Sequence, residues 1–189
     1  ISIENVEFLS FNYALNDEKH KEVFEKYFNT ITHEDNPFAD LNLAYCKYGF
    51  FLHVPKNTVI EKPIHVFYLS QNQEENTFYN TRNLLIAEAG SKVEVIESHH
   101  NFDDTFTFTN SVTEIFVYPN AKADWHKLQN DSDTSYLVDN TYARQEKDSL
   151  ATVNTFSFGG KLVRNNLDFI HNGENINSFM NGITIINND

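Results

Sequence analysis

Apolar residues recur with two different periods along this chain, and the change of period divides it. Between residues 17 and 31 they follow one another every three or four positions, as on one face of a helix. Asn16 or Asp17 would cap this helix, and Pro37 forbids its continuation. We therefore expect an extended entry over residues 1–15 and then one amphipathic helix, whose buried stripe consists of Val23, Phe24, Tyr27, Phe28 and Ile31.

The sequence after Pro37 is typical of strands. "FFLHVP" and "PIHVFYLS" are rich in β-branched and aromatic residues, which favour strands. From residue 78 onward a unit repeats: an apolar residue, a variable residue and an asparagine, then a strand, a turn residue and a second strand. The turn residues lie 30, 28 and 25 positions apart, at Gly90, Asn120, Asp148 and Gly173, with an earlier turn near Asn57.

Aligning the second strands on their turns predicts columns of equivalent residues. Two columns are mainly apolar and would face inward, and the polar column between them would face outward, since side chains alternate along a strand. The inward columns are Val93, Ala123, Ala151 and Ile176, then Val95, Trp125, Val153 and Ser178; the outward column is Glu94, Asp124, Thr152 and Asn177. The repeated asparagines, which would form a stacked ladder, are Asn80, Asn110, Asn140 and Asn165.

These columns favour an all-β solenoid, a parallel β-helix, with a short N-terminal α-helix. One unit cannot bury its apolar face alone, whereas stacked units of 25–30 residues can. An antiparallel β-sandwich is the competing fold, because it also consists of short alternating strands. A sandwich does not require Gly, Asn or Asp at every corner, so we prefer the solenoid.

Charge and composition narrow the classes of partner. The formal charge of −13, from 27 acidic and 14 basic residues, argues against nucleic acid and anionic membranes as partners. The single cysteine, Cys46, excludes an internal disulfide and any multi-cysteine metal site within this chain, and it fits a reducing, cytoplasmic compartment. The chain has no apolar run of membrane-spanning length, and both ends look cut, so we expect a fragment.

The segment "NPFADLNLAYCKYGFFLHVPKNTVIEKPIHVFYLS" resembles the SufB/SufD family of iron–sulfur cluster assembly proteins. The matching features are Phe38, the Leu41-Asn42-x-Ala44 run, Gly49, Val54-Pro55 and Pro63-Ile64. "NSVTEIFVYPNAKADWHKLQND", "NTFSFGGKLVRNNLDF" and "GENINSFMNGITI" are similar to later core segments of SufD. The resemblance spans essentially the whole chain.

The resemblance implies a right-handed β-helix core within a scaffold subunit that is not itself an enzyme. It implies a SufB-like paralogue and a SufC-like ATPase as partners, with an iron–sulfur cluster and ATP at the level of the whole complex and no cofactor in this fragment. A SufD-like chain is preferred over a SufB-like one because a set of cysteines is missing. We expect residues 1–36 to form the entry and helix, and residues 37–189 to form the core, truncated at its C-terminal end.

Residue patterns for chemistry are sparse, and we assign no catalytic, cofactor-binding or metal-binding residue. Glu97 and His99 share one strand face, so together they supply at most two metal ligands; Asp124 or His126 could add a third, but His126 falls on the opposite face. We expect any contact of Glu97 and His99 with Lys127 to be a surface pairing. Cys46 reads as a buried small apolar residue.

Two further patterns have structural explanations. The pair Asp103-Asp104 would suit a glycosidase only if carboxylates converged on one groove, and it lies in a polar loop. "SFGGKLVR" lacks the spacing of a phosphate-binding loop and reads as a bulge or corner. The alternatives to the scaffold are therefore a solenoid hydrolase or lyase acting on carbohydrate, a SufB-like paralogue, and a metal-binding protein that uses Glu97 and His99. We also expect self-association through an open apolar end near Ile186.

Overall fold

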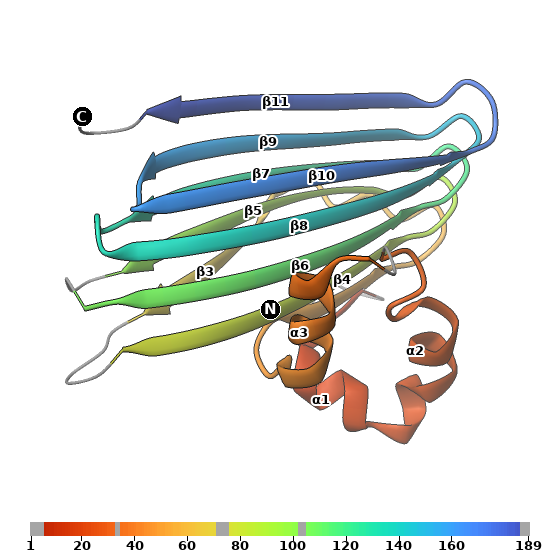
Figure 1. Ribbon diagram of the computed structural model, residues 1–189. Helices are drawn as coiled ribbons and strands as arrows, with labels where there is room; N and C mark the ends of the chain where they lie inside the picture. Colours follow the sequence, from red (N-terminus) through yellow and green to blue (C-terminus); the bar gives the residue numbers. More distant parts are fainter. Residues whose placement is uncertain (1–5, 33–34, 71–75, 102–104, 186–189) are drawn as a thin grey trace.

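The computed structural model describes residues 6–32, 35–70, 76–101 and 105–185, which form two sheets and a group of short helices (Figure 1). One sheet contains β1 (Glu7–Ser10), β2 (Phe50–Val54), β4 (Thr77–Ala87), β6 (Thr107–Val117), β8 (Ser135–Glu146) and β10 (Leu162–Asn172), in that order. The other contains β3 (Ile64–Ser70), β5 (Lys92–Asn101), β7 (Lys122–Asp131), β9 (Leu150–Gly159) and β11 (Asn177–Ile185). The helices are α1 (Phe11–Asn16), the 3-10 helix η1 (Glu18–His20), α2 (Lys21–Tyr27) and α3 (Pro37–Tyr45).

The chain alternates between the two sheets, and this alternation makes a solenoid. Each coil places one strand in each sheet, and its strands pair in parallel with those of the next coil. β1 is the exception, since it pairs antiparallel with β2. The predicted all-β solenoid with a helical N-terminal region is confirmed.

Successive coils turn at stacked corners that need a left-handed backbone. Asn57, Gly90, Asn120 and Asp148 have φ angles between 58° and 70°. The backbone N–H of each donates to a carbonyl in the next coil; Gly90, for example, donates to Pro119 over 3.0 Å. Glycine and asparagine adopt this backbone at low cost, which explains why only Gly, Asn and Asp recur there.

The last corner is at Asn175, and its prediction at Gly173 was wrong. Asn175 has a φ of 56° and its side chain donates to Asp148 over 2.8 Å. This moves the last strand by two residues, so that Ser178 and Met180, rather than Ile176 and Ser178, lie beside Ala151 and Val153. The columns through the first three coils are confirmed, because Val93, Ala123 and Ala151 are in register, as are Val95, Trp125 and Val153.

The predicted asparagine ladder is only partly correct. The side chain of Asn110 donates to Asn80 over 3.0 Å, but Val138 is the next residue in this register. Asn140 lies two places further on and instead accepts from Asn166 over 2.8 Å, while Asn165 lies beside Asp139. The reason is a shorter connection: residues 132–134 join β7 to β8, whereas residues 102–106 join β5 to β6.

The helical region differs from the expected single helix over residues 17–31. Helix α2 ends at Tyr27, and α1 lies where an extended entry was predicted. Helix α3 lies at the start of the predicted core, where no helix was expected: Asn36 caps it by accepting from the N–H groups of Phe38 and Ala39, and Pro37 lies in its first turn. Proline is favoured at that position because its missing N–H has no helical partner to lose.

The helices cover the outer face of the sheet that contains β4 and β6. The predicted apolar stripe does pack there, since Phe24, Tyr27 and Ile31 are buried in a cluster with sheet residues. The side chain of Asn42 donates to the carbonyls of Thr81 and Asn110, both over 2.9 Å, which fixes α3 across two coils.

The interior between the sheets is divided. Its half beside the corners is apolar and contains Leu85, Val95, Ile115, Trp125 and Val153. Its half beside the opposite loops contains buried charged and hydroxyl side chains instead. That polar half holds the candidate functional site.

Candidate functional site

The polar half begins where the inward column of β5 changes from apolar to ionisable residues. Val93 and Val95 are followed on the same face by Glu97 and His99, so alternation along the strand points both into the solenoid. Lys127 lies beside Glu97 on the adjacent strand β7. Glu97 is fully buried, and Lys127 is only 5% exposed.

Glu97 is the centre of a buried hydrogen-bond network. It accepts from Nε2 of His99 over 2.7 Å and from Nε1 of Trp125 over 2.8 Å. Nζ of Lys127 lies 4.0 Å from the same carboxylate. These partners compensate the cost of removing a carboxylate from water.

Lys127 connects the two sheets across the interior. Its Nζ donates to both carboxylate oxygens of Asp139 over 2.8 and 2.7 Å, and to Oγ1 of Thr141 over 2.7 Å. A weaker bond reaches Oγ1 of Thr113 over 3.4 Å. Residues from β5, β6, β7 and β8 are thereby joined, so the charges form one network through successive coils.

The network shifts the pKa values of its members. Burial alone would raise the pKa of Glu97, but Lys127 and the hydrogen bonds from His99 and Trp125 outweigh it and hold that pKa at about 2. Burial would lower the pKa of His99, and its bond with Glu97 outweighs this and raises it above 6.5. Both shifts favour the charged forms, a carboxylate on Glu97 and an imidazolium on His99.

The structure changes the expected role of this pair. Glu97 and His99 do share a face, and His126 does lie on the opposite one, where it bonds Asn154 over 2.8 Å and contacts Glu94 at 3.2 Å. The expected surface pairing with Lys127 is wrong, because all three side chains are enclosed between the sheets. The signal was present in the sequence, since the inward alternation of Val93 and Val95 continues without interruption.

The structure brings together no predicted metal site. Among the described residues, no group of three or more His, Cys, Asp or Glu side chains is arranged to hold a metal ion. Asp103 and Asp104 lie outside the described residues.

Cys46 is half-buried at the end of α3 and packs beside the helical cluster. Burial raises the pKa of its thiol, which disfavours the reactive thiolate.

The expected bend at "SFGGKLVR" is confirmed. Gly159 and Gly160 have φ angles of 71° and 81°, and they lie where β9 ends and the chain returns toward β10. A Cβ atom on Gly159 would come within 2.5 Å of the carbonyl oxygen of Asp131. These glycines therefore serve a tight corner.

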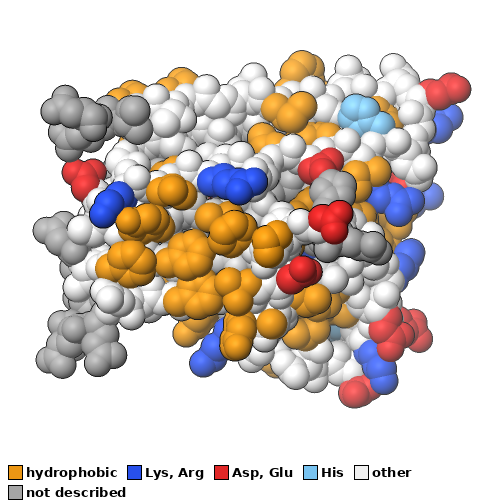
Figure 2. Space-filling model, viewed as in Figure 1, with side chains coloured by type: hydrophobic (Ala, Val, Ile, Leu, Met, Phe, Trp, Pro, Cys, Tyr) orange, Lys and Arg blue, Asp and Glu red, His pale blue; other side chains and the backbone are white. Residues whose placement is uncertain are grey.

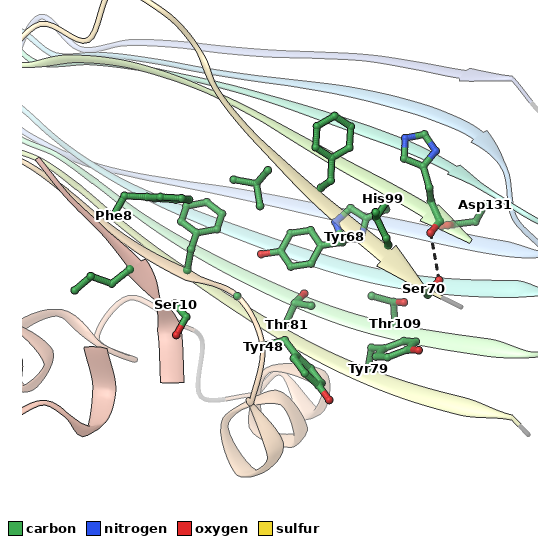
Figure 3. A pocket seen from close by; sticks show the side chains of 17 residues that line it. Phe8, Ser10, Tyr48, Tyr68, Ser70, Tyr79, Thr81, His99, Thr109 and Asp131 are labelled. Atoms are coloured by element: carbon green, nitrogen blue, oxygen red, sulfur yellow. Dashed lines mark hydrogen bonds between the residues drawn. The ribbon is translucent and has the colours of Figure 1, made fainter. Parts of the chain in front are cut away.

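A cavity of about 550 Å³ adjoins the network at the first coil (Figure 3). Its wall includes His99 and Tyr68, whose rings are stacked with centroids 4.7 Å apart. Sequence reasoning missed this cavity because its wall combines β1 and β2 with strands that follow much later. No local pattern marks such a wall.

In the view of Figure 2, apolar side chains gather over the first parts of β4, β6 and β8. Phe78, Phe108, Tyr136 and Leu162 follow one another in register across neighbouring strands. The rings of Phe78 and Phe108 stack with centroids 5.1 Å apart.

None of the helices in the described ranges is long and apolar enough to cross a membrane.

Comparison with known proteins identifies the family. Residues 68–189 match the family model for the SUF system FeS cluster assembly, SufBD core domain, and residues 4–66 match that for the SufBD protein N-terminal region. An iron-sulfur cluster assembly SufBD family protein of Synechocystis sp. is 26% identical over 174 residues, which are 88% of this chain and 38% of that protein. One of Staphylococcus aureus is 31% identical over 121 residues, 63% of this chain and 26% of that protein.

The chain therefore spans less than two fifths of the length of these relatives. The core match begins within β3 and covers the later coils of the solenoid, whereas the match to the N-terminal region covers the helices, β1 and β2. The chain belongs to the SufBD family of iron–sulfur cluster assembly proteins.

Proposed function

We propose that this chain forms part of the β-solenoid core of a scaffold subunit in a SUF-type complex, with a SufB-like paralogue and a SufC-like ATPase as partners. The match of residues 68–189 to the SufBD core is the observation that supports this most. A SufD-like identity is preferred, because the chain has one cysteine and thiolates are the usual protein ligands of iron–sulfur clusters.

The last coil offers a physical means of association. The side chains of Phe179, Met180, Ile183 and Ile185 on β11 are each about half exposed. β10 and β11 are also the outermost strands of their sheets. An outermost strand has backbone groups that a homologous strand can pair with, so further solenoid coils or a related subunit would extend both sheets.

The proposal gives this chain a structural part in cluster assembly. The iron–sulfur cluster is the product of the whole complex, ATP is the substrate of its ATPase partner, and this chain positions the subunits, without catalysis of its own, in the cytoplasm. Residues 1–36 would lead into the core of residues 37–189, and α2 and α3 fix that connection against the outer face of the solenoid.

Copurification tests the proposal. The full-length protein that contains this chain, with an affinity tag, should retain both a SufB-like and a SufC-like protein through washing in moderate salt. An untagged culture is the control for nonspecific retention. Recovery of neither partner, under conditions in which the tagged protein is folded, would contradict the proposal.

The exposed last coil gives a second test. The isolated chain of 189 residues should self-associate as its concentration rises, because the apolar side chains of β11 are exposed. Met180→Lys places a charge in the inward column at this end and should weaken the association. Light scattering that shows a monomer throughout the concentration range would contradict this expectation.

A further inference from the structure

The cavity beside His99 has the size and lining of a small-molecule site. It lies at the first coil, between β3 in one sheet and the start of β4 in the other, and β1 and β2 close one end of it (Figure 3). Aromatic side chains form much of its wall, among them Phe8, Tyr48, Phe50 and Tyr68. A volume of about 550 Å³ falls in the usual range of ligand pockets, which are mainly apolar with a few converging polar groups.

His99 supplies the first polar group. Its Nε2 is engaged by Glu97, and in the described part of the chain no residue bonds its Nδ1. The ring lies in the cavity wall, stacked on Tyr68, and its side chain is 11% exposed. The bond with Glu97 raises the pKa of His99 and so favours the imidazolium form, in which Nδ1 is a hydrogen-bond donor.

Thr81 supplies the second polar group. The residue is 3% exposed, and its hydroxyl has no hydrogen-bond partner among the described residues. Figure 3 shows this hydroxyl pointing into the cavity toward Tyr68. A buried hydroxyl without a partner costs free energy, and a polar ligand in the cavity would remove that cost.

We propose that this cavity binds a small organic carboxylate with an apolar, ring-sized body. The carboxylate accepts a hydrogen bond from Nδ1 of His99, the hydroxyl of Thr81 donates a second one, and the apolar body lies against Phe8 and Phe50. Among the described residues of the wall, Asp131 carries the one carboxylate side chain, and it accepts a hydrogen bond from Nε2 of Gln129 over 3.1 Å. The proposal is independent of the scaffold function.

Trp125 provides a reporter for binding. It is the only tryptophan of the sequence, its Nε1 donates to Glu97, and its ring stacks on Phe50 with centroids 5.6 Å apart. A ligand that contacts His99 and Phe50 therefore changes the environment of the indole on two sides, through the Glu97 hydrogen bond and through the stacked ring of Phe50. Tryptophan fluorescence, excited at the red edge of its absorption, follows the titration directly.

The experiment titrates the purified chain with 4-phenylbutyrate and, separately, with the neutral 4-phenylbutyramide. We expect a saturable fluorescence change with the acid and a dissociation constant at least tenfold weaker for the amide, because the amide lacks the charge that pairs with the imidazolium. His99→Gln should remove most of this preference for the acid. Equal affinity for acid and amide in the wild type, or no saturable change, would overturn the proposal.

Two further variants separate binding from folding. Thr109 on β6 lines the cavity and is not one of the bonded residues of the network, so Thr109→Phe should fill the cavity and abolish binding while the unfolding transition is retained. His126→Gln, on the outer face of β7, is the matched histidine control and should bind like the wild type. Unchanged binding by a folded Thr109→Phe variant would place the ligand elsewhere and overturn the proposal.

Discussion

The two halves of the solenoid interior are built on the same strands but differ in chemistry. Beside the corners, Val95, Trp125 and Val153 stack in an apolar column. Two residues further along the same strands, Glu97 and Lys127 occupy equivalent inward positions and are just as buried. The apolar half is therefore expected to stabilise the fold, because it buries apolar surface. In the polar half, the removal of charged side chains from water costs free energy, so that half is better suited to binding or positioning.

Truncation of Trp125, in the apolar half, should cause the largest loss of stability. Trp125→Ala removes a large, almost fully buried ring and the donor to Glu97. We expect a loss of about 3–5 kcal/mol in the free energy of unfolding, as for other buried aromatic residues. Trp125→Phe, which retains most of the ring, is the matched variant in urea unfolding; an equal loss for both would show that the lost volume is not the cause.

Removal of the Lys127 charge should be almost as costly in the polar half. Lys127→Met preserves the aliphatic chain but removes the cation beside Asp139 and leaves Glu97 with His99 as its remaining cationic partner. Removing one member of a buried ion pair costs about 3 kcal/mol or more. Lys122→Met, on the exposed face of the same strand, is the control and should change the unfolding free energy by less than about 1 kcal/mol.

The contribution of His99 to the free energy of unfolding should depend on pH. Because its pKa in the folded protein lies above 6.5, the stability it contributes is fully present below pH 6.5 and is lost as the pH rises through the folded value. The difference in unfolding free energy between wild type and His99→Gln should therefore shrink with rising pH. Urea unfolding at a series of pH values measures this, and a difference that grows with pH would contradict the assignment.

The smallest loss of stability is expected at a corner between two strands of the solenoid. Gly90→Ala places a Cβ atom 2.5 Å from Oδ1 of Asn57 and forces alanine into a φ of 70°. The left-handed backbone alone costs about 1–2 kcal/mol for a residue other than glycine. Gly90→Asn, which tolerates this backbone better, should lose less in thermal unfolding; the opposite order would point to the side-chain contact rather than the backbone.

The sequence predicted the apolar half better than the polar one. Alternation and corner residues were enough to place Val93, Val95 and Trp125, because apolar side chains have one favourable environment. Alternation also points Glu97 and Lys127 inward, but charged side chains are rarely buried, and Asp139, the partner of Lys127, comes from a different sheet. The registers at Asn140 and Asn175 were missed because coil lengths change within loops, where no periodic pattern exists.

The most direct test of this division is the unfolding free energy of one triple variant, Glu97→Gln, Lys127→Met and Asp139→Leu. It removes the opposed charges together, and replacement of a whole buried ionic group by residues of similar size is often neutral or stabilising. We predict that the triple variant equals or exceeds the wild type in stability, although Lys127→Met alone is destabilised. A triple variant less stable than Lys127→Met would show that the polar half itself stabilises the solenoid, and would contradict the account.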